Sequence, residues 1–80
     1  MHIHLFRVLT MIEPQITEAI QKRRKLLKIT QRDLAEISGV SLRTVKALET
    51  GDANPTLEIL ARVLEPLGLR IITAERVTNE

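Results

Sequence analysis

Cysteine, tryptophan and tyrosine are absent from this 80-residue chain, and Phe6 is its single aromatic residue. Without cysteine the chain has neither a disulfide framework nor a thiolate metal site. Without further aromatic residues, its core must be aliphatic. A chain this short buries only about 60% of its unfolded surface, so it lies near the lower limit for folding alone. Pairing with a second copy is a common solution at this size.

A long apolar run is also missing. His2, His4 and Arg7 interrupt the apolar stretch at residues 1–12, so the sequence predicts neither secretion nor a membrane span, and a cytoplasmic location is expected. The two histidines could ligate a metal, but no further ligand is evident, and neither a metal site nor a cofactor is predicted. Met11 is an alternative start of translation, so the role of the first ten residues is left open.

Positive charge is concentrated in one part of the chain. Residues 22–46 contain eight Lys/Arg against two acidic residues, a net charge of +6, whereas residues 47–80 contain three basic and six acidic residues, a net charge of −3. One basic sector on a nearly neutral chain indicates a polyanion on one side of the molecule. Charge alone leaves open a second interpretation, in which "KRRK" is the solvated face of a helix.

Hydrophobic periodicity predicts four helices, at residues 14–28, 31–38, 42–50 and from a cap at Asn54 or Thr56 to Gly68. Thr30 and Ser41 suit helix starts, and Gly39 suits a helix end. The residues expected on the buried sides of these helices are Ile16, Ala19, Ile20, Leu26, Leu27, Leu34, Ala35, Ile37, Val45, Leu48, Leu57, Leu60, Val63, Leu64 and Leu67.

The end of the chain has a different pattern. The stretch "LRIITAERV", from Leu69, is rich in β-branched residues and predicts one strand. Because unpaired backbone groups are costly, this strand needs a partner, either the N-terminal "HIHLFRVL" or a second chain. We prefer the second chain, which makes Leu69, Ile71 and Ile72 dimerisation residues. The expected organisation is an arm at 1–13, a helical domain at 14–68, and a strand and tail at 69–80.

Residues 30–51, "TQRDLAEISGVSLRTVKALETG", resemble the helix-turn-helix of the Cro/phage-repressor (XRE-type) family through "TQRDLA", "SGVS", "TV" and "E.G". The resemblance extends over residues 16–72 and implies a mainly α, four-helix, lambda-repressor-like fold. In this pattern Ala35 allows two helices to cross closely, Gly39 makes the sharp turn, and Val45 fills the angle between the helices. The helix at 42–50 would then protrude and fit the major groove of DNA.

The resemblance also implies which residues contact DNA. Arg43 is the expected base reader, since its guanidinium can bond to guanine O6 and N7, and Leu42 could meet a thymine methyl. Gln31 is expected to reach a phosphate at the start of its helix. The remaining expected contacts are Lys46 and Ala47 in the groove, and Arg24, Ser41, Thr44 and Asn54 at the DNA backbone.

Within the family, the small size and the "EPLGLRIITAERV" ending resemble HipB-like antitoxins. This resemblance implies a homodimeric repressor of its own operon, a palindromic operator with half-sites about 34 Å apart, and a HipA-like kinase toxin as partner. The N-terminal extension departs from that pattern. The alternatives are a free-standing regulator and an interaction module that has lost DNA binding. An enzyme is not expected, because neither paired carboxylates beside a pocket nor a phosphate-binding glycine loop is found.

Overall fold

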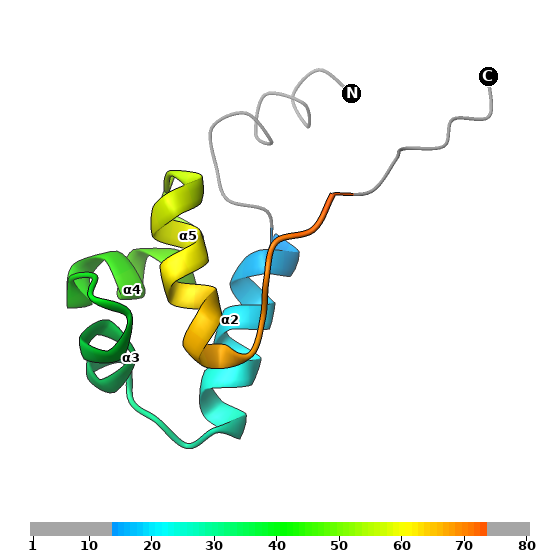
Figure 1. The fold of residues 1–80 in the computed structure, drawn as a ribbon. Helices are drawn as coiled ribbons and strands as arrows, with labels where there is room; N and C mark the ends of the chain where they lie inside the picture. The colour runs from blue at the N-terminus through cyan, green and yellow to red at the C-terminus, as the bar shows by residue number, and fades with distance from the viewer. Residues whose placement is uncertain (1–13, 74–80) are drawn as a thin grey trace, which may run out of the picture.

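Helix α2 (Pro14–Leu26) begins the part of the chain that the computed structural model describes, residues 14–73. It is followed by α3 (Gln31–Ser38), α4 (Leu42–Thr50), α5 (Leu57–Leu64) and the 3-10 turn η1 (Glu65–Leu67). In Figure 1, α3 and α4 lie together on one side of the molecule, and the segment after η1 runs back past α2. The expected mainly helical architecture is therefore present.

The bounds predicted for α3 and α4 are confirmed, and each helix begins at a side-chain cap. Thr30 Oγ1 accepts a hydrogen bond from the Asp33 amide at 2.9 Å, and Asp33 Oδ2 accepts one from the Thr30 amide at 2.9 Å. This reciprocal capping box satisfies two amides that the helix itself leaves unpaired. Ser41 Oγ accepts from the Thr44 amide at 3.0 Å in the same way.

The first and last predicted helices end earlier than expected. Helix α2 ends at Leu26 rather than at residue 28, because Lys28 takes the left-handed conformation with φ of 59°. Thr56, not Asn54, caps α5, and its Oγ1 accepts from the Ile59 amide at 3.1 Å. The α-helical pattern of α5 stops at Leu64 and tightens into η1. Pro66 explains this change, because it has no N–H to donate.

Nine aliphatic residues form the buried core of the described chain: Ile20, Leu34, Ala35, Val45, Leu48, Leu60, Val63, Leu64 and Leu67. Each was expected on a buried side. Four other residues expected there are instead exposed: Leu26, Leu27, Ile37 and Leu57. Leu57 is the first residue of α5 and is 72% exposed. Leu26 and Leu27 lie where α2 ends.

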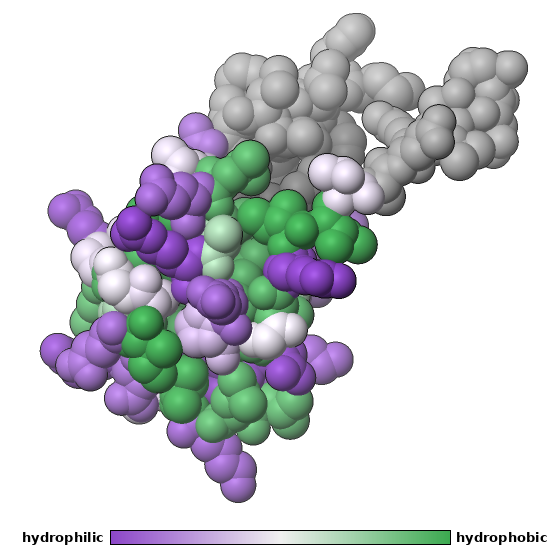
Figure 2. All heavy atoms as spheres, in the orientation of Figure 1, coloured by the Kyte–Doolittle hydropathy of each residue, from purple (hydrophilic) through white to green (hydrophobic). Residues whose placement is uncertain are grey.

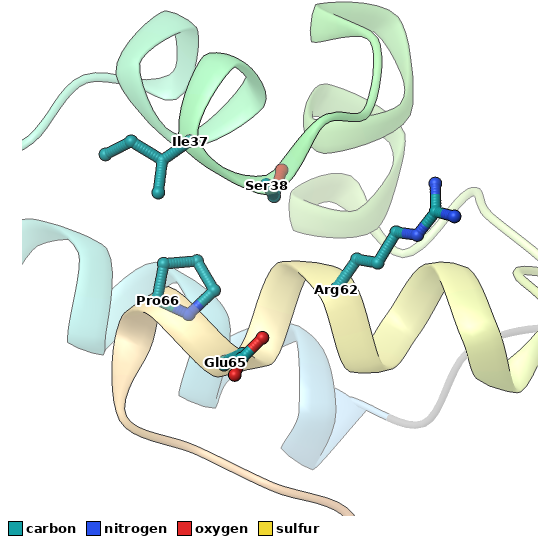
Figure 3. Close-up of a pocket in the computed structure, with 5 residues that line it drawn as sticks. All are labelled: Ile37, Ser38, Arg62, Glu65 and Pro66. Atoms are coloured by element: carbon teal, nitrogen blue, oxygen red, sulfur yellow. The ribbon is translucent and has the colours of Figure 1, made fainter.

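Ile37 shows how a short helix limits a periodicity argument. Helix α3 buries Leu34 and Ala35, whereas the Ile37 side chain is 61% exposed. It lines an open groove of about 300 Å³ together with Pro66 and Arg62, and Figure 3 shows the isoleucine above the proline ring. The apolar stripe of α3 is therefore narrower than predicted.

The strand expected from Leu69 does not appear in its described part, residues 69–73. Residues 69–73 have no strand assignment, and no strand occurs anywhere within residues 14–73. The Leu69 amide bonds back to the Leu64 carbonyl at 3.0 Å and so closes the preceding turn. A strand requires a paired partner, and the described part of the chain contains no second strand. The proposed partner "HIHLFRVL" and the tail at 74–80 lie outside the described residues.

Candidate nucleic-acid interface

The turn between α3 and α4 is closed by backbone bonds to one carbonyl. The amides of Gly39 and Val40 both donate to the Ala35 oxygen, at 3.0 and 3.1 Å. Gly39 has φ of 74°, and a Cβ added to it would meet nothing within 4 Å. Glycine is therefore suited to this position by its left-handed backbone and not by lack of space. Two residues later Ser41 caps α4, so the second helix begins immediately.

Helix α4 is held by one side and presents the other. Val45 and Leu48 are fully buried and α4 packs against both α2 and α3. Arg43 and Lys46 are exposed. They lie three residues apart and so share a face of the helix. Two long cationic side chains on a rigidly held helix can approach an anionic groove without disturbing the core.

Most of the smaller residues predicted at the interface are half-buried or hydrogen-bonded to other residues of the protein. Leu42 is half-buried and packs against the core, and Ala47 is also half-buried. Ser41 Oγ donates to Thr44 Oγ1 at 2.9 Å while also capping the helix, so both hydroxyls already have a partner. Asn54 is exposed in the loop between α4 and α5. Direct contact with a groove is thus least obstructed at Arg43 and Lys46.

A buried carboxylate that the sequence reasoning left without a role joins three helices. Glu49, near the end of α4, has a side chain only 5% exposed. Its two oxygens accept from Arg24 Nε at 2.6 Å and from Arg24 Nη2 at 3.0 Å, and Oε1 also accepts from Gln31 Nε2 at 3.1 Å. Gln21 donates to the Glu49 backbone carbonyl. A buried charge is tolerated only with such partners.

Arg24, which was predicted to contact a phosphate, is held within this cluster. Its side chain is 13% exposed, and its third nitrogen, Nη1, donates to the Ile29 carbonyl at 2.9 Å. Hydrogen bonding to Glu49 raises the pKa of Arg24 above its ordinary value, against the opposing effect of burial. The guanidinium therefore braces the loop before α3 and, through Glu49, orients the amide of Gln31.

The basic run "KRRK" divides between structure and surface. Arg23 Nε donates to the Leu67 carbonyl at 2.9 Å, so this residue caps the end of η1. Lys22 and Lys25 are exposed, as are Lys28 and Arg32. Charge alone allowed two interpretations of this run, a surface for a polyanion or the solvated face of a helix. Neither holds for all four residues, because the two arginines bond within the protein and the two lysines are exposed.

These features define a class of protein. A short helix, a glycine turn and a second capped helix with an exposed cationic face constitute a helix-turn-helix unit. Residues 20–72 match the helix-turn-helix family, and the chain belongs to that family. Units of this kind place their second helix in the major groove of DNA.

Several relatives carry names that agree with this assignment. An uncharacterized HTH-type transcriptional regulator of Haemophilus influenzae is 40% identical over 65 residues, which cover 80% of this chain and 65% of the relative. The cryptic phage CTXphi transcriptional repressor RstR of Vibrio cholerae is 33% identical over 57 residues, covering 71% of this chain and 51% of the repressor. A regulator of Methanothermobacter thermautotrophicus is 43% identical over 49 residues, covering 61% of this chain and 71% of the relative.

The matched relatives differ in length from this chain. It spans just under two thirds of the Haemophilus protein and about half of the Vibrio repressor. No solved structure matches the chain significantly. None of the helices between residues 14 and 73 is long and apolar enough to cross a membrane. The described residues hold no group of three potential metal ligands, and the two histidines lie outside them.

Proposed function

We propose that this chain is a sequence-specific transcriptional repressor that inserts α4 into the major groove of DNA. The observation that carries the proposal is the exposed pair Arg43 and Lys46 on a helix whose opposite side is locked into the core by Val45 and Leu48. Arg43 reads a base, most favourably guanine, and Lys46 lies beside it in the groove. Leu42 and Ala47 contribute apolar contacts at the edges.

The backbone of the DNA is held by residues around this helix. Gln31 lies at the first position of α3, where free amides and the helix dipole favour a phosphate. Ser41, Thr44 and Asn54 contact neighbouring phosphates, and Arg24 acts indirectly by holding Glu49. Phosphate contacts of this kind fix the register of the protein, while Arg43 provides the discrimination.

Substitution of Arg43 tests the proposal. A preferred site is first selected from a randomised duplex library, and affinity is then measured by fluorescence anisotropy at several salt concentrations. Arg43→Ala is expected to lose about 5- to 150-fold at the preferred site, equivalent to ~1–3 kcal/mol. Arg62→Ala is the matched control, because Arg62 is exposed on α5 and forms a surface ion pair with Glu58. Equal affinities of the wild type and Arg43→Ala would reject the assignment.

We further propose that the repressor is a homodimer that binds a palindromic operator. Ile71 and Ile72 are 42% and 73% exposed in a segment without secondary structure, and pairing with a second copy would bury them together with Leu69. Two-fold symmetry would place the half-sites about 34 Å apart. Ile72→Asp is expected to yield a monomer in sedimentation equilibrium. Ile37→Asp, at another exposed isoleucine, should remain dimeric. Unchanged association of Ile72→Asp would contradict the proposal.

The dimer is proposed to serve as a HipB-like antitoxin in the cytoplasm, where it represses its own operon and binds a kinase-type, HipA-like toxin. The apolar ending after η1 supports this assignment. The similarity to a protein named as a phage repressor supports the second candidate, a free-standing regulator. Co-purification of the full chain with the product of the neighbouring gene distinguishes the two. If no such complex forms while operator binding is intact, the antitoxin role is rejected and the free-standing regulator is supported.

A further inference from the structure

An apolar cleft opens on the side of the core near the start of α2. It is bordered by the first half of that helix and by the segment after η1, and its volume is about 170 Å³. The lining residues are Gln15, Ile16, Ala19, Leu64, Leu69 and Arg70. Leu64 belongs to the buried core, and Ile16 and Leu69 pack against that core. The cleft is therefore continuous with the hydrophobic core and not an isolated hollow of the surface.

The size and lining of the cleft suit a large apolar side chain. An aliphatic cavity of about 150 Å³ accommodates a benzene-sized group and is not favourable for water. Four of the six lining residues are aliphatic. Figure 2 shows that apolar residues also gather on this face of the molecule. An aromatic ring or two small aliphatic groups would fill the space and continue the core outward.

Residues 1–13 are the nearest source of such side chains. They join α2 at Pro14, directly before the lining residues Gln15 and Ile16. Eight of the thirteen are large and apolar: Met1, Ile3, Leu5, Phe6, Val8, Leu9, Met11 and Ile12. An extended chain covers about 3.3 Å per residue, so the stretch from Phe6 to Pro14 is more than long enough to fold back over the first turns of α2.

We propose that residues 1–13 pack along this cleft, with Phe6 entering between Ile16, Ala19 and Leu69. Covalent attachment beside the cleft gives this segment a high effective concentration there, which a second copy of the chain lacks. The core of the described residues consists of nine aliphatic side chains. Packing of the segment would enlarge it with the chain's single aromatic residue. This inference is independent of DNA binding.

A paramagnetic label on the segment tests its position. Because the chain contains no cysteine, Arg7→Cys provides a single site for a nitroxide. The proposal expects strong broadening of the methyl signals of Ile16, Ala19 and Leu69, and little effect on Val45 at the α3–α4 side. The experiment is carried out in the Ile72→Asp background, which removes the proposed dimer contact. In that background, a mixture of spin-labelled, isotopically unlabelled chains with isotope-labelled chains that carry no spin label should show no such broadening. Broadening that appears in the mixture would identify a second copy as the occupant and overturn the proposal.

A double-mutant cycle tests the energetic part. Phe6→Ala should raise the unfolding equilibrium constant of the full chain about tenfold or more, as expected for loss of a buried large apolar side chain. Thr10→Ala, at a polar position of the same segment, is the matched control. In an Ala19→Leu background, where an aliphatic side chain occupies the cleft, the effect of Phe6→Ala should largely vanish. Equal effects of Phe6→Ala and Thr10→Ala, or full additivity with Ala19→Leu, would refute the proposal.

Discussion

Replacing Glu49 by glutamine probes the polar cluster that joins α2, α3 and α4. The substitution keeps the shape of the side chain but removes its charge. The guanidinium of Arg24, 13% exposed, would then remain in the interior without a counter-ion. Its bond from Nη1 to the Ile29 carbonyl would persist, whereas the short bond from Nε to Oε2, at 2.6 Å, would be weakened. The structure therefore predicts a substantial loss of stability from a nearly isosteric change.

The magnitude follows from burial. Breaking a buried ion pair by removing one partner costs roughly 3–5 kcal/mol. The residual hydration of Arg24 and the amide oxygen of the new glutamine reduce the expected cost to about 2–3 kcal/mol. Since ~1 kcal/mol changes the midpoint by roughly 4–8 °C in a domain this small, the Tm of Glu49→Gln should fall by about 10–20 °C. Thermal and urea denaturation followed by circular dichroism measure this loss.

A double substitution separates the stability of the fold from the orientation of Gln31. Arg24→Met with Glu49→Met removes both charges and should recover much of the stability, because hydrophobic replacement of a buried pair is often neutral. It should not recover DNA affinity, since Gln31 Nε2 loses its acceptor on Glu49. Glu58→Gln is the control, because its pair with Arg62 is largely exposed and should contribute under about 1 kcal/mol. Equal losses for Glu49→Gln and Glu58→Gln would refute the reasoning.

Three further predictions concern single positions. Lys28→Gly should raise the free energy of unfolding by about 0.5–1 kcal/mol, because φ at Lys28 is 59° and glycine adopts this region freely; a lower urea midpoint would contradict this. Thr17→Val should also stabilise by about 1 kcal/mol, because the buried Thr17 Oγ1 finds no hydrogen-bond partner within residues 14–73; a loss of stability would reveal one. The hydrogen bonds from the Thr30 amide and hydroxyl lower the pKa of Asp33 in the folded protein. The ionised Asp33 carboxylate therefore stabilises the fold above the pKa of an unfolded aspartate, about 3.9, and this stabilisation is lost as the pH falls through the pKa of Asp33 in the folded protein. Asp33→Asn should therefore lose less stability than the wild type between pH 7 and pH 3.

The local parts of the fold were predictable because their causes are local. Thr30, Ser41 and Gly39 act within four residues of themselves, through caps and a left-handed turn, and the bounds of α3 and α4 follow from them. The end of α2 was missed because Lys28 gives no sequence signal for a left-handed conformation that glycine or asparagine usually takes. The last helix was predicted to continue to Gly68, but Pro66 lies within this stretch and causes α5 to tighten into η1.

The polar cluster depends on contacts far apart in sequence, yet its members carried an overlooked signal. Arg24 lies four residues after the buried Ile20, and Glu49 lies four residues after the buried Val45. Helical spacing therefore places both charged residues on buried faces. Because a buried charge requires an opposite partner, the two could have been paired from the periodicity alone. What the sequence could not show is that Gln31 would complete the same cluster.

The apolar ending of the chain could be interpreted only in part from the sequence. Its hydropathy indicates that this surface is covered, but it does not identify the segment that covers it. Ile71 and Ile72 are exposed, and the nearby cleft at Ile16 and Leu69 is open in the described part of the molecule. A second copy and the segment at residues 1–13 are both proposed to cover parts of this face. The two are compatible only if Phe6 fills the cleft and leaves Ile72 free for the partner. Removal of residues 2–10 should then destabilise the chain without abolishing dimerisation, whereas Ile72→Asp should abolish dimerisation and leave Phe6 in contact with Ile16.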